Sequence, residues 1–265
     1  AGDTARTDRP STRAAMPRLM PLLFLTLSVP CFAQQGTETV PPLTVTVGLN
    51  HAPPYRIVEG GRHSGLYVDI FEAIAERLGW KVRYREAPFR RVLLMVERGE
   101  VDVMLGPLRT PSREAMFEFV AAAFPPERRL FFYLGEANRI ERYGDLYGKR
   151  IGVLEGARYF NRFDQDPDLI KESAARYDNL ARMLAWGRVD VVIAPELVGL
   201  YTLRRQGVAA SVSPFFVPGQ RSWIAVSRHS EAARYAEDIR AALKLLEMNG
   251  TYEALVLKYM ESEAL

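Results

Sequence analysis

The sequence predicts an α/β protein built from two similar lobes. Segments that alternate apolar and polar residues, as strands do, precede segments with apolar residues at helical spacing, and this order is typical of a parallel sheet. A unit of glycine, a charged residue and Val-Asp-Val joins a helix to a strand twice, within 98–103 and 186–191. The length of 265 residues suits one large or two small domains. The alternative, two ordinary helix-turn-strand units in one sheet, stays open.

The first half of the chain predicts three strands separated by helices. Apolar and β-branched residues alternate at 43–49, and Pro53 and Pro54 end this strand in a loop because they lack N–H donors. A helix follows at 69–78, where apolar residues have helical spacing and Gly79 provides a stop. The remaining elements of this half are a strand at 80–84, a helix containing 92–96 and a strand at 101–105.

The second half repeats this pattern. The expected elements are a strand at 150–154, a helix that opens at 155–159, a helix containing 180–184 and a strand at 189–193. An amphipathic helix at 232–248, a turn at 249–252 and a last helix to Tyr259 follow. The repetition of strand, helix and strand supports two α/β lobes.

The N-terminal segment has the organisation of a leader followed by a secretion signal. Arg18 precedes an apolar run at 19–30, and the small residue Ala33 follows the run. This run is shorter than the about 20 apolar residues that a membrane span needs. We expect cleavage after Ala33, which makes 1–33 the leader and signal, and a periplasmic location. Lipid attachment to Cys31 is the less favoured alternative, because a proline precedes it where lipoprotein signals have a small residue.

The composition excludes several classes of function. With 35 basic and 32 acidic residues the formal charge is +3, too small to predict a nucleic-acid partner. Cys31 is the only cysteine in the sequence, so a chain cut after Ala33 has no disulfide or thiolate site. The three histidines form no metalloprotease motif, and the sequence contains no phosphate-loop or dinucleotide fingerprint. We therefore predict no metal and no cofactor.

Six short motifs follow one another along the chain. They are Gly-Leu-Tyr-Val-Asp-Ile at 65–70, Gly-Glu-Val-Asp-Val at 99–103, Thr-Pro-Ser-Arg at 110–113, Gly-Lys-Arg-Ile-Gly-Val at 148–153, Gly-Arg-Val-Asp at 187–190, and Asn-Gly-Thr-Tyr with a later Lys-Tyr at 249–259. In these motifs and their order, from about 43 to 259, the chain resembles the bacterial periplasmic solute-binding proteins of family 3. That family includes receptors for polar amino acids.

The resemblance implies a type II periplasmic binding fold, in which two lobes joined by two crossings trap a ligand between them. Carried onto this chain, it places lobe 1 at 43–125 and 223–265, and lobe 2 at 129–216. The crossings are expected near 124–129 and 217–222. Open α/β sheets bind ligands beyond the carboxyl ends of their strands, so the cleft is expected where those edges face each other.

The resemblance also implies which residues hold the ligand. Arg113 aligns with an arginine that binds the ligand carboxylate, to which a guanidinium offers a planar fork. The segment 156–159 aligns with a helix start whose backbone N–H groups favour an anion. Ala157 and Arg158 replace hydroxyl residues there, so a hydroxyl is lost and a positive charge is gained. Further ligand-binding candidates are the aromatic residues His51, Tyr55 and Phe89, and Arg109 in the loop of Arg113.

One position departs from the family pattern. Receptors of this type place an aspartate after Gly-Arg-Val-Asp to hold the ligand ammonium, and here Ala194, Pro195 and Glu196 occupy that segment. Two alternatives stay open: Glu196 takes that role, or the site has no ammonium anchor. Without Glu196 in the site, a carboxylate-bearing molecule other than an α-amino acid is favoured, because burying an unpaired ammonium costs several kcal/mol.

We predict a non-enzymatic receptor for a small polar, carboxylate-bearing ligand, either an amino acid or an organic acid. It is expected to act as a monomer and to serve an ABC importer or a membrane sensor. A dehydratase-like enzyme on the same scaffold is one alternative, with Glu196 as its candidate acid or base. A periplasmic adaptor that binds no ligand is the other, suggested by Leu108, Ala157 and Pro195 in the expected polar shell.

Overall fold

The computed structural model describes residues 42–262, with side chains to residue 259, and this part of the chain belongs to one compact unit. None of the helices in it is both long and apolar enough to span a membrane. The predicted secretion signal and Cys31 lie outside the described residues. The strands and helices predicted from residue 43 onward lie within them.

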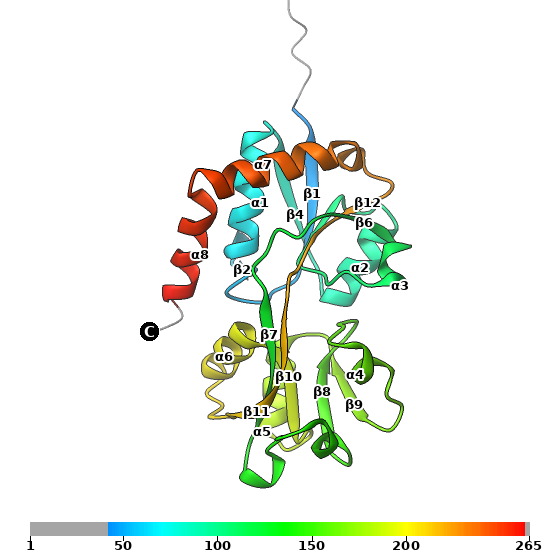
Figure 1. The fold of residues 1–265 in the computed structure, drawn as a ribbon, viewed down its shortest axis with the longest axis vertical. Helices are drawn as coiled ribbons and strands as arrows, with labels where there is room; N and C mark the ends of the chain where they lie inside the picture. Colours follow the sequence, from blue (N-terminus) through cyan, green and yellow to red (C-terminus); the bar gives the residue numbers. More distant parts are fainter. Residues whose placement is uncertain (1–41, 263–265) are drawn as a thin grey trace, which may run out of the picture. The chain divides into compact units, whose positions relative to one another are not determined.

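The first sheet is mixed and has five strands in the order β4-β1-β5-β12-β6 (Figure 1). β1 pairs in parallel with β4 and β5, as the predicted order of elements requires. β12 pairs antiparallel with β5 and β6, so a late segment of the chain completes this sheet. The bounds are β1 Thr44–Leu49, β4 Lys81–Glu86, β5 Val103–Leu105, β6 Phe117–Ala121 and β12 Ile224–Ser227.

Helices from both ends of the described chain cover this sheet. α1 contacts β4, α2 contacts β1 and β5, and α7 contacts β6, while α8 contacts α1 and α7. The predicted helix at 232–248 begins as a short 3-10 helix, η3, before α7. The bounds are α1 Leu66–Arg77, α2 Phe89–Glu97, α3 Pro111–Glu114, η3 Glu231–Tyr235, α7 Ala236–Met248 and α8 Thr251–Ser262, with a hairpin of β2 Ile57–Glu59 and β3 Arg62–Ser64.

The second sheet also has five strands, in the order β11-β7-β10-β8-β9. β10, β8 and β9 are parallel, and β7 pairs antiparallel with β10 and β11. The strands are β7 Glu127–Tyr133, β8 Arg150–Leu154, β9 Ile170–Ala174, β10 Val191–Pro195 and β11 Ser211–Gln220. The helices are η1 Glu136–Asn138, η2 Tyr143–Leu146, α4 Asn161–Gln165, α5 Tyr177–Ala185 and α6 Glu196–Arg205.

The chain passes between the sheets twice, from β6 to β7 and from β11 to β12. Figure 1 shows β7 and β11 running side by side toward the first sheet, and their pairing extends to Gln220 opposite Glu127. Two mixed sheets linked in this way confirm the predicted α/β class with two sheet-based parts. The start of β7 therefore lies where the chain enters the second sheet.

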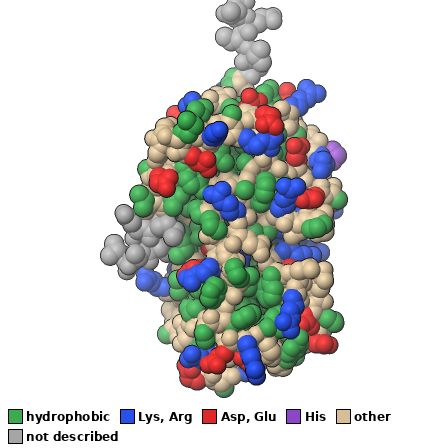
Figure 2. All heavy atoms as spheres, in the orientation of Figure 1, with side chains coloured by type: hydrophobic (Ala, Val, Ile, Leu, Met, Phe, Trp, Pro, Cys, Tyr) green, Lys and Arg blue, Asp and Glu red, His purple; other side chains and the backbone are tan. Residues whose placement is uncertain are grey.

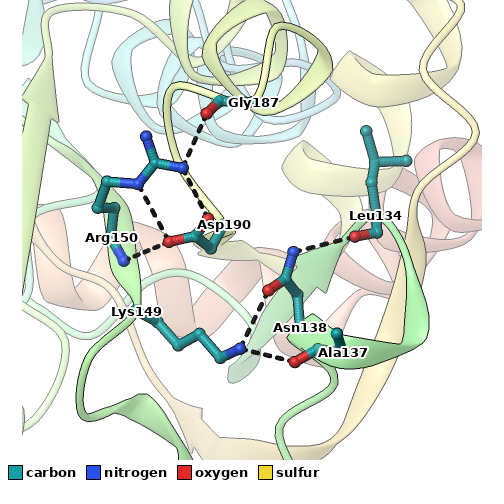
Figure 3. A network of polar contacts seen from close by, with 7 residues as sticks. All are labelled: Leu134, Ala137, Asn138, Lys149, Arg150, Gly187 and Asp190. Carbon is teal, nitrogen blue, oxygen red and sulfur yellow. Dashed lines mark hydrogen bonds and ion pairs between the residues drawn. The ribbon is translucent and has the colours of Figure 1, made fainter.

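The repeated Val-Asp-Val unit has the same structural role in both sheets. The Asp102 carboxylate accepts a hydrogen bond of 2.6 Å from the Thr46 N–H of β1, and the Asp190 carboxylate accepts one of 2.7 Å from the Arg150 N–H of β8. Each aspartate thus binds the backbone of the neighbouring parallel strand. Figure 3 shows the second case, in which the Arg150 guanidinium also donates to Asp190 and to the Gly187 carbonyl.

We expect Asp190→Asn to lower the free energy of unfolding at pH 7 by about 1.5–3 kcal/mol, the range for hydrogen bonds to charged groups. The bonds from Arg150 lower the pKa of Asp190, so the stabilisation is present above the ordinary aspartate pKa of about 4 and is lost as the pH falls through the lower folded value. Urea unfolding at pH 7 and pH 3 measures both effects. Asp168→Asn, at an exposed aspartate, is the control, and an equal loss in both variants would contradict the assignment.

The helix predicted to open at 155–159 is wrong. Gly156 has a left-handed φ of +80° in a turn, residues 157–160 are irregular, and α4 begins at Asn161 and has five residues. Tertiary packing explains the difference, because Tyr159 is buried and its hydroxyl accepts a hydrogen bond of 2.9 Å from the Leu154 N–H. The start of this segment is therefore irregular and has backbone carbonyls available. It lacks the row of helical N–H groups that we expected.

Candidate functional site

A cavity of about 50 Å³ lies at the carboxyl ends of strands from both sheets. Gly106, which follows β5, lines it from the first sheet, and Leu154 of β8 and Pro195 of β10 line it from the second. Residues of the two crossings complete the wall. On the face drawn in Figure 2, Lys and Arg side chains lie over the elements of both sheets. The other lining residues are Tyr55, Arg56, Tyr67, Phe89, Leu108, Arg113, Glu127, Arg129, Ala157, Arg158, Tyr159, Tyr177, Val198 and Ser222.

Arg113 connects the two sides of this cavity. It lies on α3, which begins with Pro111, and its side chain is buried. Its Nη1 donates to the Leu108 carbonyl over 2.9 Å, and its Nη2 donates to the carbonyl of Gly156, which follows β8, over 2.8 Å. Burial, together with the nearby Arg158 charge, lowers the pKa of Arg113 to about 10. The guanidinium is therefore cationic at neutral pH and stands at the junction of the two sheets.

Four other predicted site residues share the cavity with Arg113. The Phe89 ring lies under the guanidinium, with 5.7 Å from the guanidinium carbon to the ring centroid. Tyr55 stacks on Tyr67 with 4.6 Å between ring centroids. Ala157 and Arg158 line the opposite wall, and Arg158 is exposed at the cavity edge. The structure thus brings these four residues to one place.

Three predicted residues are not among those that line the cavity. The Glu196 carboxylate, at the start of α6, accepts a 2.8 Å hydrogen bond from Nε of Arg128. Arg109 pairs with Glu114 over 2.6 Å and borders a separate surface groove. His51 accepts a 3.1 Å hydrogen bond from the Val58 N–H through Nδ1, and burial lowers its pKa. Each of these side chains has its own protein partner.

Two buried arginines that line the cavity were missed from the sequence. Arg56 is 7% exposed, donates to the Leu105 carbonyl over 3.0 Å and lies 5.3 Å from the Tyr67 ring centroid. Its Nε is buried with no hydrogen-bond partner among the described residues. Arg129 is 5% exposed, and its guanidinium donates to the Glu127 carbonyl. Three buried guanidinium groups, including that of Arg113, therefore surround the cavity.

Glu127 was also missed, and it is the one acidic residue among those that line the cavity in the described chain. It is 7% exposed, and its Oε1 is buried with no hydrogen-bond partner among the described residues. Burial raises its pKa to about 7, while the charges of Arg129 and Arg56 and hydrogen bonding with Tyr55 oppose the rise. The alternation of Glu127 and Arg129 in a strand was the available signal, because residues two apart share one face of a strand.

Two ion pairs also join elements of the first sheet's half of the molecule to elements of the second sheet's half. Arg90 of α2 binds Glu155, which follows β8, over 3.0 Å. Arg205 of α6 binds Glu59 of β2. Together with the bond from Arg113 to Gly156, they hold elements of the first sheet against elements of the second.

Known proteins are similar to this chain over most of its length. Residues 45–262 match the model of the family described as bacterial extracellular solute-binding proteins, family 3. A Vibrio harveyi protein named as an amino-acid ABC transporter-binding protein is 24% identical over 217 residues, which cover 79% of this chain and 85% of the relative. The L-cystine-binding protein of Bacillus subtilis is 22% identical over 218 residues, covering 82% and 80%.

Solved structures share the same architecture. An ancestral arginine-binding protein bound to arginine is 25% identical, with a TM-score of 0.71 over 82% of this chain and 97% of its own. A histidine kinase sensor domain similar to periplasmic binding proteins is 22% identical, with a TM-score of 0.71 over 82% and 96%. These likenesses confirm the predicted periplasmic binding fold, and the family match confirms the prediction of a binding protein and not an enzyme. The chain belongs to the bacterial extracellular solute-binding proteins, family 3.

Proposed function

We propose that the chain is a receptor for a small carboxylate-bearing molecule of the amino-acid type. The observation that carries the proposal is the grouping of Arg56, Arg113 and Arg129, all buried, around one cavity at the carboxyl ends of both sheets. Buried guanidinium groups need an anionic partner, and a carboxylate matches their fork geometry. The printed names of the relatives, which include amino-acid and cystine binding, support the same ligand class.

Within this proposal, five of the residues predicted from the sequence form the ligand site. Arg113 binds the carboxylate, and Arg158 adds positive charge at the edge. Phe89, Tyr55 and Ala157 cover the apolar part of the ligand, since aromatic rings give contact area at low entropy cost. His51, Arg109 and Glu196 do not line the cavity, so the proposed site does not include them. Their roles in ligand binding stay predictions.

We also propose where the protein acts and what it serves. A family of extracellular solute-binding proteins agrees with export through the signal predicted at 1–33 and with a periplasmic location. Delivery to an ABC importer and reporting to a membrane sensor are both supported, the first by the Vibrio harveyi relative and the second by the sensor-domain structure. We favour the importer, because the names of the Vibrio harveyi and Bacillus subtilis relatives describe transport or binding proteins.

Ligand entry requires the two lobes to separate. The cavity is lined by residues of both sheets, and the Arg113–Gly156 hydrogen bond joins the two sides, so a ligand enters between them when the lobes move apart. We propose lobe 1 at 43–125 and 223–265 and lobe 2 at 129–216, moving about the two crossings. In this view the contacts of Arg113, Arg90 and Arg205 across the cleft belong to a closed state, which the ligand stabilises.

We expect ligand to compact the protein. Small-angle X-ray scattering of the full chain, with and without the amino acid that binds best, measures this directly. The radius of gyration should fall when the ligand is present, because the bound state favours closure. Superimposable curves at saturating ligand would contradict the hinge.

A thermal-shift screen tests the proposed function. A ligand that binds only the folded protein raises the melting temperature. The panel contains the twenty L-amino acids, L-cystine, short dicarboxylic acids and polyamines. A carboxylate-bearing compound that raises the melting temperature supports the proposal, whereas a response to polyamines alone would contradict it.

A further inference from the structure

Two buried polar atoms in the wall of the cavity lack protein partners, and they are of opposite kinds. Among the described residues, Oε1 of Glu127 is an acceptor without a donor, and Nε of Arg56 is a donor without an acceptor. Both residues line the cavity and each is 7% exposed. A buried polar atom without a partner costs free energy, so a ligand that both donates and accepts would satisfy these two residues.

We propose that the Glu127 carboxylate binds the ammonium group of the ligand, so that the solute is an α-amino acid and not a plain organic acid. Glu127 then replaces the aspartate that is absent after β10. This inference rests on the proposed function, since it assigns a residue within the same ligand site. It also resolves the two alternatives that the sequence left open around Glu196.

The strand register places Glu127 close to the position of the absent aspartate. Pro195, at the end of β10, pairs with Arg129 of β7. Glu127 lies two residues before Arg129, so both side chains are on the same face of β7. Neighbouring strands are about 4.8 Å apart and two residues span about 6.6 Å, so a glutamate at 127 reaches the space beside Pro195. The carboxyl of Glu127 is also hydrogen-bonded to the backbone of Leu197, just beyond Pro195.

The charges around Glu127 leave room for a cation. Arg129 and Arg56 face it from the crossing and from the loop after β1, and Tyr55, Tyr67 and Tyr177 are the other titratable groups close to it. Neither arginine donates a hydrogen bond to Oε1. An ammonium group at Oε1 would favour the ionised carboxylate. Because burial raises the pKa of Glu127 to about 7, binding near neutral pH should release a fraction of a proton from it.

The test compares amino acids with the same molecules lacking the ammonium group. Isothermal titration measures L-glutamate against glutarate, L-aspartate against succinate and L-glutamine against glutaramate. The proteins are the wild type, Glu127→Gln and the matched control Glu196→Gln, whose carboxylate lies outside the cavity with Arg128. Titrations in phosphate and in Tris give the number of protons released, and thermal unfolding checks that each variant folds.

We expect the wild type to bind the best amino acid at least about 30-fold more tightly than its deaminated partner. In Glu127→Gln this ratio should fall to near one and proton release should disappear, while Glu196→Gln retains both. An unchanged ratio in Glu127→Gln, or an equal loss for both members of a pair, would overturn the assignment. So would a loss of the ratio in Glu196→Gln alone. Deaminated acids that bind the wild type as tightly as amino acids contradict only this inference, whereas binding of neither class contradicts the proposed function itself.

Discussion

Arg113→Ala is expected to lower the affinity for the carboxylate ligand by about thirtyfold to several thousandfold. Removing one partner of a buried, hydrogen-bonded charge pair costs about 2–5 kcal/mol or more, and this range converts to that loss. Arg113 is 4% exposed, and its Nη2 bond to the Gly156 carbonyl joins α3 to the segment after β8, so the variant also weakens the closed state. Isothermal titration with the best ligand from the thermal-shift screen measures the effect.

Two variants separate the effect of the guanidinium's charge on affinity from the effect of its shape and its place in the cavity. Arg113→Lys keeps the charge but loses the planar fork, so we expect a loss smaller than that of Arg113→Ala but still at least about tenfold. Arg109 belongs to the same loop, but its guanidinium pairs with Glu114 outside the cavity. In Arg109→Ala the affinity for the ligand should therefore change by less than about threefold. Wild-type affinity in Arg113→Ala would exclude the anion site.

The second large effect concerns the ligand side chain. Amino acids with a cationic side chain should bind at least about 30-fold more weakly than amino acids of similar size with an amide or acidic side chain. Among the described residues that line the cavity, Glu127 is the only acidic one, whereas Arg56, Arg113, Arg129 and Arg158 are basic. With Glu127 engaged by the α-ammonium, a second cation would face guanidinium groups, and like charges in an interface cost several kcal/mol.

Competition titrations with L-arginine against L-citrulline, and with L-lysine against L-glutamine, measure this discrimination. The comparison is informative because the similar ancestral structure holds arginine. Tight binding of L-arginine to this chain would show that another carboxylate reaches the ligand. Asp164, which lies near Arg113 and Arg158, is the one to mutate in that case.

The elements that the sequence predicted well are those whose pattern is local. The strands expected at 43–49 and 150–154 are present as short, largely buried strands, and the repeated Val-Asp-Val unit has one role in both sheets. The helix expected at 155–159 is absent because the chain turns at Gly156 and Tyr159 is buried in the core beside the second sheet. Burial of Tyr159 in that core depends on tertiary packing, and no spacing along the chain reports it.

The site was predicted in part, and the missing part has a physical explanation. Arg113 was found because it stands in a motif that the family shares, and Phe89 because the resemblance aligns it with an aromatic position of the family. Glu127, Arg129 and Arg56 were missed because charged residues are rarely fully buried, so a sequence places them on the surface by default. Glu196 was considered because it is adjacent to the expected position along the chain, although Arg128 on the opposite face of β7 binds it. Strand pairing places the start of β7, with Arg129 and Glu127, alongside the end of β10, and adjacency along the chain does not report this.

A crystal structure of the full chain with the tightest-binding amino acid tests the central claim most directly. We predict the ligand in the cavity between the sheets, with its carboxylate on the guanidinium of Arg113, its ammonium on Oε1 of Glu127 and the two lobes closed around it. A ligand bound elsewhere, or one whose carboxylate contacts neither Arg113 nor Arg56, would contradict it.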